Sequence, residues 1–317
     1  METRKLGTLA VSVVGLGCNN FGGRLDQERT SRVIDAALAA GINFFDTADV
    51  YGGTHSEELV GKALGARRSS VLIATKFGIP LDAERKGGAH PGYIRRAVED
   101  SLRRLGSDYI DLYQLHRPDP EVPIADTLGA LEELRRAGKV REIGCSNFSV
   151  EQLREAEAAT QPGAARFVSV QNEYSLLKRD PEHGVLAHCT TRGIGFLPYF
   201  PLASGLLSGK YAPGAAPVPS SARLADASAP LATRFRSEGN TAVADALGRF
   251  AQSRGHSLLE LAFSWLLAQP AVSSVIAGAT SAEQIEANAK AARWQLSADD
   301  LTEVDRIAPR GPKELTG

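Results

Sequence analysis

The chain of 317 residues is 43% hydrophobic and 23% charged, and its 36 Lys and Arg nearly balance 37 Asp and Glu, for a net charge of −1. This composition is ordinary for a globular protein, and the lack of a basic excess disfavours nucleic acids and anionic membranes as partners. Cys18, Cys145 and Cys189 are widely spaced, which fits a reducing compartment. The first 17 residues hold no apolar stretch long enough for a signal peptide or membrane helix, so we expect a cytoplasmic protein.

In chain order, two short runs around Gly7 and Thr8 first predict a hairpin over residues 4–13. Eight apolar runs then predict strands over residues 11–17, 42–46, 71–76, 109–116, 140–146, 167–171, 194–199 and 272–278. Helical patterns lie between most of them, at residues 27–40, 56–64, 91–105, 124–137 and 260–268. Two long loops, 78–92 and 208–236, are typical of lids or ligand clamps.

The repeated alternation of strand and helix predicts parallel strands covered by helices. Eight units in a chain of this length favour a closed (β/α)8 TIM barrel over an open doubly wound sheet. Gly15 and Gly17 lack the third glycine of a G-x-G-x-x-G loop, which disfavours a Rossmann fold. We therefore predict an α/β protein of one domain, residues 1–317, with the hairpin capping the N-terminal end of the barrel.

Polar residues stand at the C-terminal ends of the predicted strands, where barrel enzymes carry their chemistry. Asp46 ends the second run, with Tyr51 five residues further on, and Lys76 and His116 end the third and fourth runs. A single Lys or His at such a position is more often a surface or rim residue. The coincidence of all four on three consecutive strands instead indicates a site.

These segments resemble the aldo-keto reductase superfamily over essentially the whole chain. The matching motifs are NFFDTADVYG (43–52), IATK (73–76), DLYQLH (111–116), IGCSNF (143–148), QNEY (171–174) and YFPLASGLLSGKY (199–211). The last motif is most similar to the branch that includes bacterial reductases and potassium-channel β-subunits. The resemblance implies NADPH-dependent reduction of aldehydes and ketones, a small-molecule carbonyl substrate, and Asp46, Tyr51, Lys76 and His116 as the catalytic residues.

Carbonyl reduction explains why a strand should lead into an acid, a phenol and two glycines. The developing alkoxide needs a proton, which Tyr51 can donate, although a free phenol has a pKa of about 10. The ammonium of Lys76 favours the phenolate, and Asp46 would hold that lysine. His116 could hydrogen-bond the substrate oxygen. The two glycines after Tyr51 would let the backbone turn sharply beside the phenol.

The same C-terminal end of the predicted barrel would bind the cofactor. Uncharged donors and acceptors at strand ends suit the nicotinamide carboxamide, and an aromatic ring suits stacking. By resemblance, the nicotinamide end is bound by Ser146, Asn147, Gln171 and Tyr199, with Asp46 on the ribose and Gly17 and Cys18 approaching through their backbone. The expected remainder of the cofactor site comprises Phe200, Leu202, Ser204, Gly205, Ser208, Lys210, Arg223, Gly278, Thr280, Gln284 and Asn288.

The adenosine end departs from the classical branch of the superfamily. Gly278 and Ala279 stand in place of a Lys-Ser pair, Gln284 in place of an Arg, and Ala287 in place of a Glu that contacts adenine. Charge complementarity to a 2′-phosphate then depends on Lys210 and Arg223. We expect NADPH to be preferred over NADH.

Other readings of the same residues are a Schiff-base aldolase using Lys76, a metal-dependent hydrolase, and a cofactor-binding regulatory subunit with vestigial catalysis. Asp46 would keep Lys76 charged, which disfavours a Schiff base, and the six histidines show no H-x-H pattern on a strand. We expect no metal. The intact set of four polar residues favours a working enzyme over a regulatory subunit.

The substrate pocket would be walled by Phe21, Tyr51, the loop 78–92, His116 and Arg117, and by residues near Tyr199 and Phe200. Loop arginines such as Arg24 and Arg85 are usually solvated but could attract an anionic group. The short polar tail after Ile307 suggests an open pocket and broad specificity. The sequence leaves the oligomeric state open.

Overall fold

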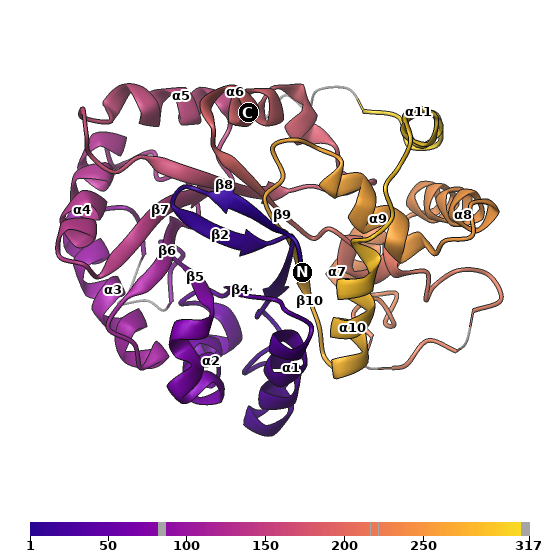
Figure 1. Cartoon of the computed structure of the whole chain (residues 1–317), viewed down its shortest axis with the longest axis horizontal. Helices are drawn as coiled ribbons and strands as arrows, with labels where there is room; N and C mark the ends of the chain where they lie inside the picture. The colour runs from indigo at the N-terminus through magenta and orange to yellow at the C-terminus, as the bar shows by residue number, and fades with distance from the viewer. Residues whose placement is uncertain (82–86, 216, 221, 312–317) are drawn as a thin grey trace.

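The structure is a computed structural model that describes residues 1–81, 87–215, 217–220 and 222–311. Eight parallel strands form a nearly closed barrel with helices around it, a (β/α)8 TIM barrel (Figure 1). In sheet order the strands are β10 (Val275–Gly278), β3 (Val14–Gly17), β4 (Phe44–Asp46), β5 (Leu72–Phe77), β6 (Ile110–Leu115), β7 (Val140–Ser146), β8 (Phe167–Glu173) and β9 (Gly195–Tyr199). The prediction of a TIM barrel is confirmed.

The barrel closes between its seventh and eighth strands through a short contact. Phe196 of β9 pairs with Val272, three residues before β10 begins, as an isolated parallel bridge. The amide of Phe196 donates to the carbonyl of Ala271 at 2.7 Å, and the amide of Ser273 donates to the carbonyl of Phe196 at 3.0 Å. Every barrel strand thus has a neighbour on both sides, at least locally.

The helices follow the apolar periodicity of the sequence, and the five predicted helices agree with the structure to within two residues at each end. The α-helices are α1 (Gln27–Ala39), α2 (His55–Leu64), α3 (Pro91–Leu105), α4 (Ile124–Arg136), α5 (Val150–Ala159), α6 (Val185–Arg192), α7 (Pro230–Phe235), α8 (Glu238–Ser253), α9 (Leu258–Leu267), α10 (Ala282–Ala291) and α11 (Ala298–Ile307). The 3-10 helices are η1 (Tyr51–Thr54), η2 (Gly65–Ser70), η3 (Asp180–His183) and η4 (Ala203–Ser208). Within the described part of the chain, no helix is long and apolar enough to cross a membrane.

Two sequence expectations need correction. The run 11–17 is not one strand, because its first two residues belong to the hairpin and β3 begins only at Val14. The loop 208–236 is not free of secondary structure, since η4 ends at Ser208 and α7 begins at Pro230 inside it. Residues 82–86 of the other long loop, with Arg85, and the last six residues of the tail lie outside the described residues.

The N-terminal hairpin, β1 (Thr3–Leu6) and β2 (Leu9–Ser12), plugs one end of the barrel (Figure 1). Its apolar side chains and those from the barrel interior form one buried cluster: Leu6, Leu9, Val11, Phe44, Ala74, Leu112, Val168, Leu197 and Ile276. Arg4 links the hairpin to the segment between α9 and β10, donating to the carbonyls of Val272 at 2.7 Å and Leu267 at 3.0 Å. The expected cap is therefore present and filled with side chains.

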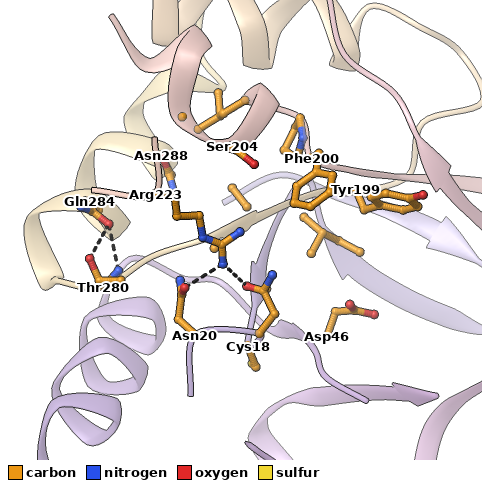
Figure 2. A pocket seen from close by; sticks show the side chains of 18 of the residues that line it. Cys18, Asn20, Asp46, Tyr199, Phe200, Ser204, Arg223, Thr280, Gln284 and Asn288 are labelled. Carbon is orange, nitrogen blue, oxygen red and sulfur yellow. Dashed lines mark hydrogen bonds between the residues drawn. The ribbon is translucent and has the colours of Figure 1, made fainter. Parts of the chain in front are cut away.

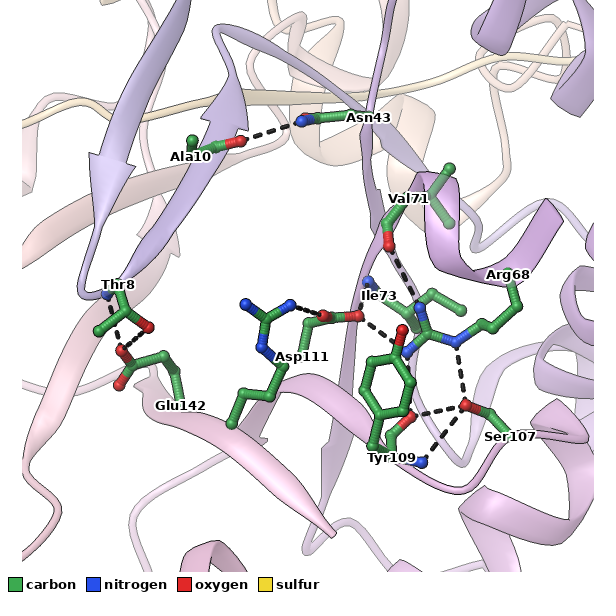
Figure 3. A network of polar contacts seen from close by, with 11 residues as sticks. Thr8, Ala10, Asn43, Arg68, Val71, Ile73, Ser107, Tyr109, Asp111 and Glu142 are labelled. Carbon is green, nitrogen blue, oxygen red and sulfur yellow. Dashed lines mark hydrogen bonds and ion pairs between the residues drawn. The ribbon is translucent and has the colours of Figure 1, made fainter. Parts of the chain in front are cut away.

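Polar contacts fix the same end of the barrel (Figure 3). In the hairpin turn, the amide and hydroxyl of Thr8 both donate to one oxygen of Glu142, at 2.7 and 2.6 Å. Buried Asp111 accepts hydrogen bonds from Arg68 at 2.8 Å, Arg141 at 2.7 Å and the amide of Ile73 at 2.9 Å. Because this end is plugged and cross-linked, access to the interior is left to the opposite end, where the strands terminate.

Candidate active site

The C-terminal ends of the barrel strands surround a cavity of about 590 Å³. Almost every residue that the sequence predicted for the site lines this cavity. Those residues are Gly17, Cys18, Asp46, Tyr51, His116, Ser146, Asn147, Gln171, Tyr199, Phe200, Leu202, Ser204, Gly205, Ser208, Lys210, Arg223, Gly278, Thr280, Gln284 and Asn288. Lys76 is an exception, because its side chain is fully buried. Phe21, which was expected to wall the substrate pocket, is also fully buried and does not line the cavity, so that expectation is wrong.

Asp46 and Lys76 form a buried ion pair between neighbouring strands. Lys76 Nζ lies 2.6 Å from Asp46 Oδ1 and donates to the carbonyl of Thr47 at 2.8 Å, and the two side chains are 0% and 4% exposed. Burial lowers the pKa of Lys76, but the charges of Asp46 and Tyr51 and hydrogen bonds to both outweigh it, so the pKa is raised overall. Lys76 is therefore an ammonium, which disfavours the Schiff-base alternative.

Tyr51 begins η1 directly above this pair. Lys76 Nζ is 5.1 Å from the centroid of the phenol ring, and the ring of His116 meets Tyr51 edge to face at 5.9 Å. Burial raises the pKa of Tyr51, while the charge of Lys76 and its hydrogen bond act to lower it. The sequence alone predicts that the lysine dominates and lowers the pKa of Tyr51. Instead burial outweighs it, so Tyr51 keeps its proton at neutral pH.

His116 follows β6 and faces Tyr51 across the mouth. Burial, together with the positive charges of Lys76 and Arg117, lowers the pKa of His116 to about 3. Its imidazole is therefore neutral at physiological pH, with one N–H to donate. Among the described residues, no hydrogen-bond partner is found for Nδ1. A neutral donor beside a protonated phenol can hold a carbonyl oxygen between them.

The predicted nicotinamide end is a chain of hydrogen bonds across the ends of four strands, β6 to β9. Ser146 Oγ donates to the carbonyl of Gln171 at 2.6 Å, and Asn147 Nδ2 donates to Ser146 Oγ at 3.1 Å and to the carbonyl of His116 at 3.0 Å. Asn147 Oδ1 accepts a hydrogen bond from the Tyr199 hydroxyl at 2.8 Å. The side chains are thus oriented by one another before any ligand is considered.

Asp46 has two further partners. Gln171 Nε2 donates to Asp46 Oδ2 at 2.9 Å, and Gln114 Nε2 approaches the same oxygen at 3.3 Å. Gln171 was predicted to bind the carboxamide, whereas Gln114 was not predicted as a site residue, because it lies within a predicted strand and has no distinguishing pattern. Both amides help to satisfy a carboxylate that is buried on the cavity floor.

The far end of the cavity carries positive charge. Arg223 Nη2 donates to Asn19 Oδ1 at 3.0 Å and to Asn20 Oδ1 at 2.7 Å, so the segment after η4 reaches across the cavity to the loop after β3 (Figure 2). Burial lowers the pKa of Arg223 and of Lys210, and the charge of Arg24 lowers both further. Three cations held together in this way favour an anionic ligand between them.

Thr280 and Gln284 form a second polar pair at this end (Figure 2). The amide of Thr280 donates to Gln284 Oε1 at 2.8 Å, and its hydroxyl approaches that atom at 3.3 Å. Asn19 and Asn20 also line the cavity but were not predicted from the sequence. Their signal was available, because two adjacent amides follow the first barrel strand at its C-terminal end.

Gly52 and Gly53 make the turn after Tyr51 with φ of +58° and +65°. A Cβ on Gly52 would lie 2.2 Å from the carbonyl oxygen of Phe21, whereas on Gly53 it would meet only His55 Nδ1, at 3.9 Å. We therefore expect Gly53→Ala to cost about 1–2 kcal/mol through backbone strain, and Gly52→Ala to cost about 2–4 kcal/mol and to displace Tyr51. Urea unfolding of the two variants checks this, and equal costs would contradict it.

Asp49 is a buried carboxyl group two residues before Tyr51. It is 1% exposed, and neither oxygen has a hydrogen-bond partner among the described residues. Burial, reinforced by the charge of Glu57, raises the pKa of Asp49 to about 8, against the opposing charges of Arg104 and Lys76. Glu57 itself is paired with Arg104 at 2.7 Å. Asp49 is therefore protonated at neutral pH.

A raised carboxyl pKa makes folding stability fall with pH. Between the unfolded value of 3.8 and the folded value of about 8, the folded protein binds one proton more than the unfolded chain, so each pH unit costs stability. We expect the wild type to lose roughly 3–5 kcal/mol relative to Asp49→Asn between pH 5 and pH 9. Urea unfolding of both proteins at the two pH values measures the difference. A constant difference would show that Asp49 does not titrate in this range.

Comparison with known proteins agrees with this geometry. The Aldo/keto reductase family model matches residues 13–309. Probable aldo-keto reductase 1 of Glycine max is 37% identical, covering 97% of this chain and 89% of the relative. A probable voltage-gated potassium channel subunit beta of Oryza sativa subsp. japonica is 36% identical, covering 92% of this chain and 91% of the relative.

The solved structure of aldo-keto reductase AKR11C1 from Bacillus halodurans, in its holo form, superposes with a TM-score of 0.81 and 33% identity, covering 99% of both chains. The chain therefore belongs to the aldo-keto reductase family, as the sequence motifs predicted. It is an oxidoreductase of that type.

Proposed function

We propose that this protein is an NADPH-dependent reductase of small-molecule aldehydes and ketones, with Tyr51 as the proton donor. The observation that carries the proposal is the position of Tyr51, whose pKa keeps it protonated between the charged Lys76 and the neutral His116. A proton donor must hold its proton before the reaction and must be helped to release it as negative charge develops. Burial does the first, and the nearby ammonium does the second.

Each residue then has a distinct task. The substrate oxygen accepts hydrogen bonds from Tyr51 and from the N–H of His116, which orients the carbonyl and stabilises the developing alkoxide. Tyr51 passes its proton to that oxygen, and Lys76 stabilises the phenolate that is left. Asp46 keeps Lys76 charged and in place from 2.6 Å. The low pKa of His116 ensures that the histidine orients the substrate rather than competing with Tyr51 as the acid.

The cavity fits a phosphorylated nicotinamide cofactor, which supplies the hydride when bound. Ser146, Asn147 and Gln171 would hold the carboxamide, and Tyr199 would stack against the ring. At the other end, Lys210 and Arg223 would bind phosphate, because their cationic groups face the same cavity. The buried hydroxyl of Ser204 also lines the cavity and has no partner among the described residues, as expected of a group reserved for a ligand.

The remaining residues of the predicted cofactor site keep their proposed roles. The backbone at Gly17 and Cys18 approaches the nicotinamide end, and Asp46 reaches its ribose. The pyrophosphate and 2′-phosphate would be covered by Phe200, Leu202, Ser204, Gly205 and Ser208, and the adenosine would be bound by Gly278, Thr280, Gln284 and Asn288. NADPH is favoured over NADH because the extra phosphate meets fixed positive charge.

A second candidate function is a nucleotide-binding regulatory subunit with little catalysis, which the similarity to a channel β-subunit favours. The two functions share the cofactor site and differ in turnover. The experiment titrates the purified protein with NADPH and NADH, following Trp and Tyr fluorescence. It then measures loss of reduced-nicotinamide absorbance with 4-nitrobenzaldehyde and a panel of other carbonyls. Tight NADPH binding with turnover supports the reductase, binding without turnover supports the subunit, and no binding contradicts both.

A further inference from the structure

The charged groups that line the cavity are almost all positive. Within the described residues, Asp46 is the one acid in the lining, and its charge is matched by Lys76 at 2.6 Å. The cations in the lining are Arg24, Arg117, Lys210, Arg223 and Arg234. The whole chain, by contrast, has a net charge of −1, so the positive charge of the lining is a local feature. The cavity is therefore built for ligands with more than one negative group.

These cations are not all at one end. Burial and the charges of Arg24 and Arg223 lower the pKa of Lys210, and burial and the charge of Arg24 lower that of Arg223. Lys210 and Arg223 are the two already proposed to bind the cofactor phosphates. Arg117 and Arg234 instead lie at the nicotinamide end, because Arg117 directly follows His116 and Arg234 contacts Glu173, which pairs with Tyr199 in the sheet. Arg234 is ion-paired with Glu173. Of these two cations, Arg117 is therefore the one without an ion-pair partner among the described residues.

Arg117 stands next to the proposed reaction centre. It follows His116, whose carbonyl accepts a hydrogen bond from Asn147 at 3.0 Å, and Asn147 in turn accepts one from Tyr199 at 2.8 Å. The guanidinium lowers the pKa of both His116 and Tyr199, which agrees with a position between them. Arg117 therefore flanks the place where a carbonyl oxygen would meet His116.

No hydrogen bond or ion pair engages Arg117 within the part of the chain that the structure describes. The acid closest in sequence, Asp119, is held elsewhere, because its oxygens accept the amides of Ala89 at 2.8 Å and Glu121 at 3.0 Å. An arginine fork with five free donors matches a carboxylate or phosphate geometrically. Its side chain is exposed at the cavity mouth, where a substrate would enter.

We propose that Arg117 binds a second, anionic group of the substrate, so that the enzyme prefers aldehydes that also carry a carboxylate or phosphate. The inference rests on the proposed reductase function and adds a substrate class to it. An open pocket accepts many shapes, and the charge of Arg117 then ranks them. The negative charge of such a substrate is also attracted by the cationic lining before contact is made.

The test compares two aldehydes of the same shape, 4-carboxybenzaldehyde and its neutral counterpart 4-formylbenzamide. Their products, 4-(hydroxymethyl)benzoate and 4-(hydroxymethyl)benzamide, are also titrated by calorimetry into the protein saturated with NADPH, which gives a readout without turnover because neither the alcohol nor the reduced cofactor can accept a hydride. Glyceraldehyde 3-phosphate against glyceraldehyde distinguishes phosphate from carboxylate. The variant is Arg117→Gln, and the matched control is Arg154→Gln, which removes the same charge from an exposed position on α5.

We expect the wild type and Arg154→Gln to favour the carboxylate over the amide by about 5- to 30-fold, in kcat/KM through KM and in product affinity. Added KCl should reduce this preference. In Arg117→Gln the preference should disappear, while turnover of 4-formylbenzamide is retained. Equal use of both aldehydes by the wild type, or a preference that survives in Arg117→Gln, would overturn the proposal. Turnover of the neutral aldehyde tests the reductase function separately.

Discussion

Replacing Tyr51 with Phe should lower kcat by about 10²- to 10⁴-fold, because the substrate oxygen loses its proton donor. The ring itself is kept, so the edge contact with His116 at 5.9 Å and the position of Lys76 should be unchanged. The measurement is single-turnover oxidation of NADPH with 4-nitrobenzaldehyde, which separates chemistry from product release.

Nucleotide binding is the control for Tyr51→Phe. Since the proposed cofactor contacts do not involve the phenol hydroxyl, quenching of protein fluorescence by NADPH should give the wild-type affinity. If kcat falls by less than tenfold, another group supplies the proton. His116, with a pKa of about 3, is a poor candidate, because it holds no dissociable imidazolium proton near neutrality.

The second large effect is expected at the buried ion pair. Asp46→Asn leaves the ammonium of Lys76 without an opposite charge, with neutral partners such as the carbonyl of Thr47, and Lys76→Met leaves the carboxylate of Asp46 with two amides. An uncompensated buried charge costs about 3–5 kcal/mol. Each single variant should therefore lose stability of this order in urea unfolding at pH 7.

The double variant, Asp46→Asn with Lys76→Met, provides the comparison. It removes both charges and keeps the side-chain volumes similar, so it should be more stable than the sum of the single changes predicts, by about 2 kcal/mol or more. Simple additivity would mean that the two groups do not act as a unit. All three variants should lack reductase activity. The double variant restores packing, but it does not restore the ammonium beside Tyr51.

The barrel could be predicted from the sequence because its signal is repeated. Eight apolar runs and the helices between them report the same architecture independently, so an error in one run, such as 11–17, does not change the result. The short helix α7 was missed because six residues in a Pro- and Ala-rich segment carry little periodicity. Its position depends on packing, as when Ala232 and Phe235 are buried against the rest of the protein.

The sequence predicted which residues gather around the cavity, whose roles stay a proposal, and it predicted their electrostatics less well. Strand-end positions identified the polar residues, since that rule needs only the order of the chain. The pKa of Tyr51 was expected to be lowered, and burial instead raises it. Burial of a phenol depends on segments that are far apart in the sequence. The same limit concealed Gln114, whose role depends on Asp46 in another strand.

The hydrogen bonds between the N-terminal hairpin and the segment before the last barrel strand have a consequence for biosynthesis. Arg4 finds its acceptors at Leu267 and Val272, and the barrel closes through Val272 and Ser273. A ribosome must therefore synthesise most of the polypeptide before the N-terminal hairpin and the last barrel strands can assemble. Contacts this distant in sequence form slowly. The cavity also combines Asn20 with Asn288. On the proposed function, a nascent or truncated chain that lacks its final strand should bind no dinucleotide, so cofactor binding would report that synthesis and barrel closure are complete.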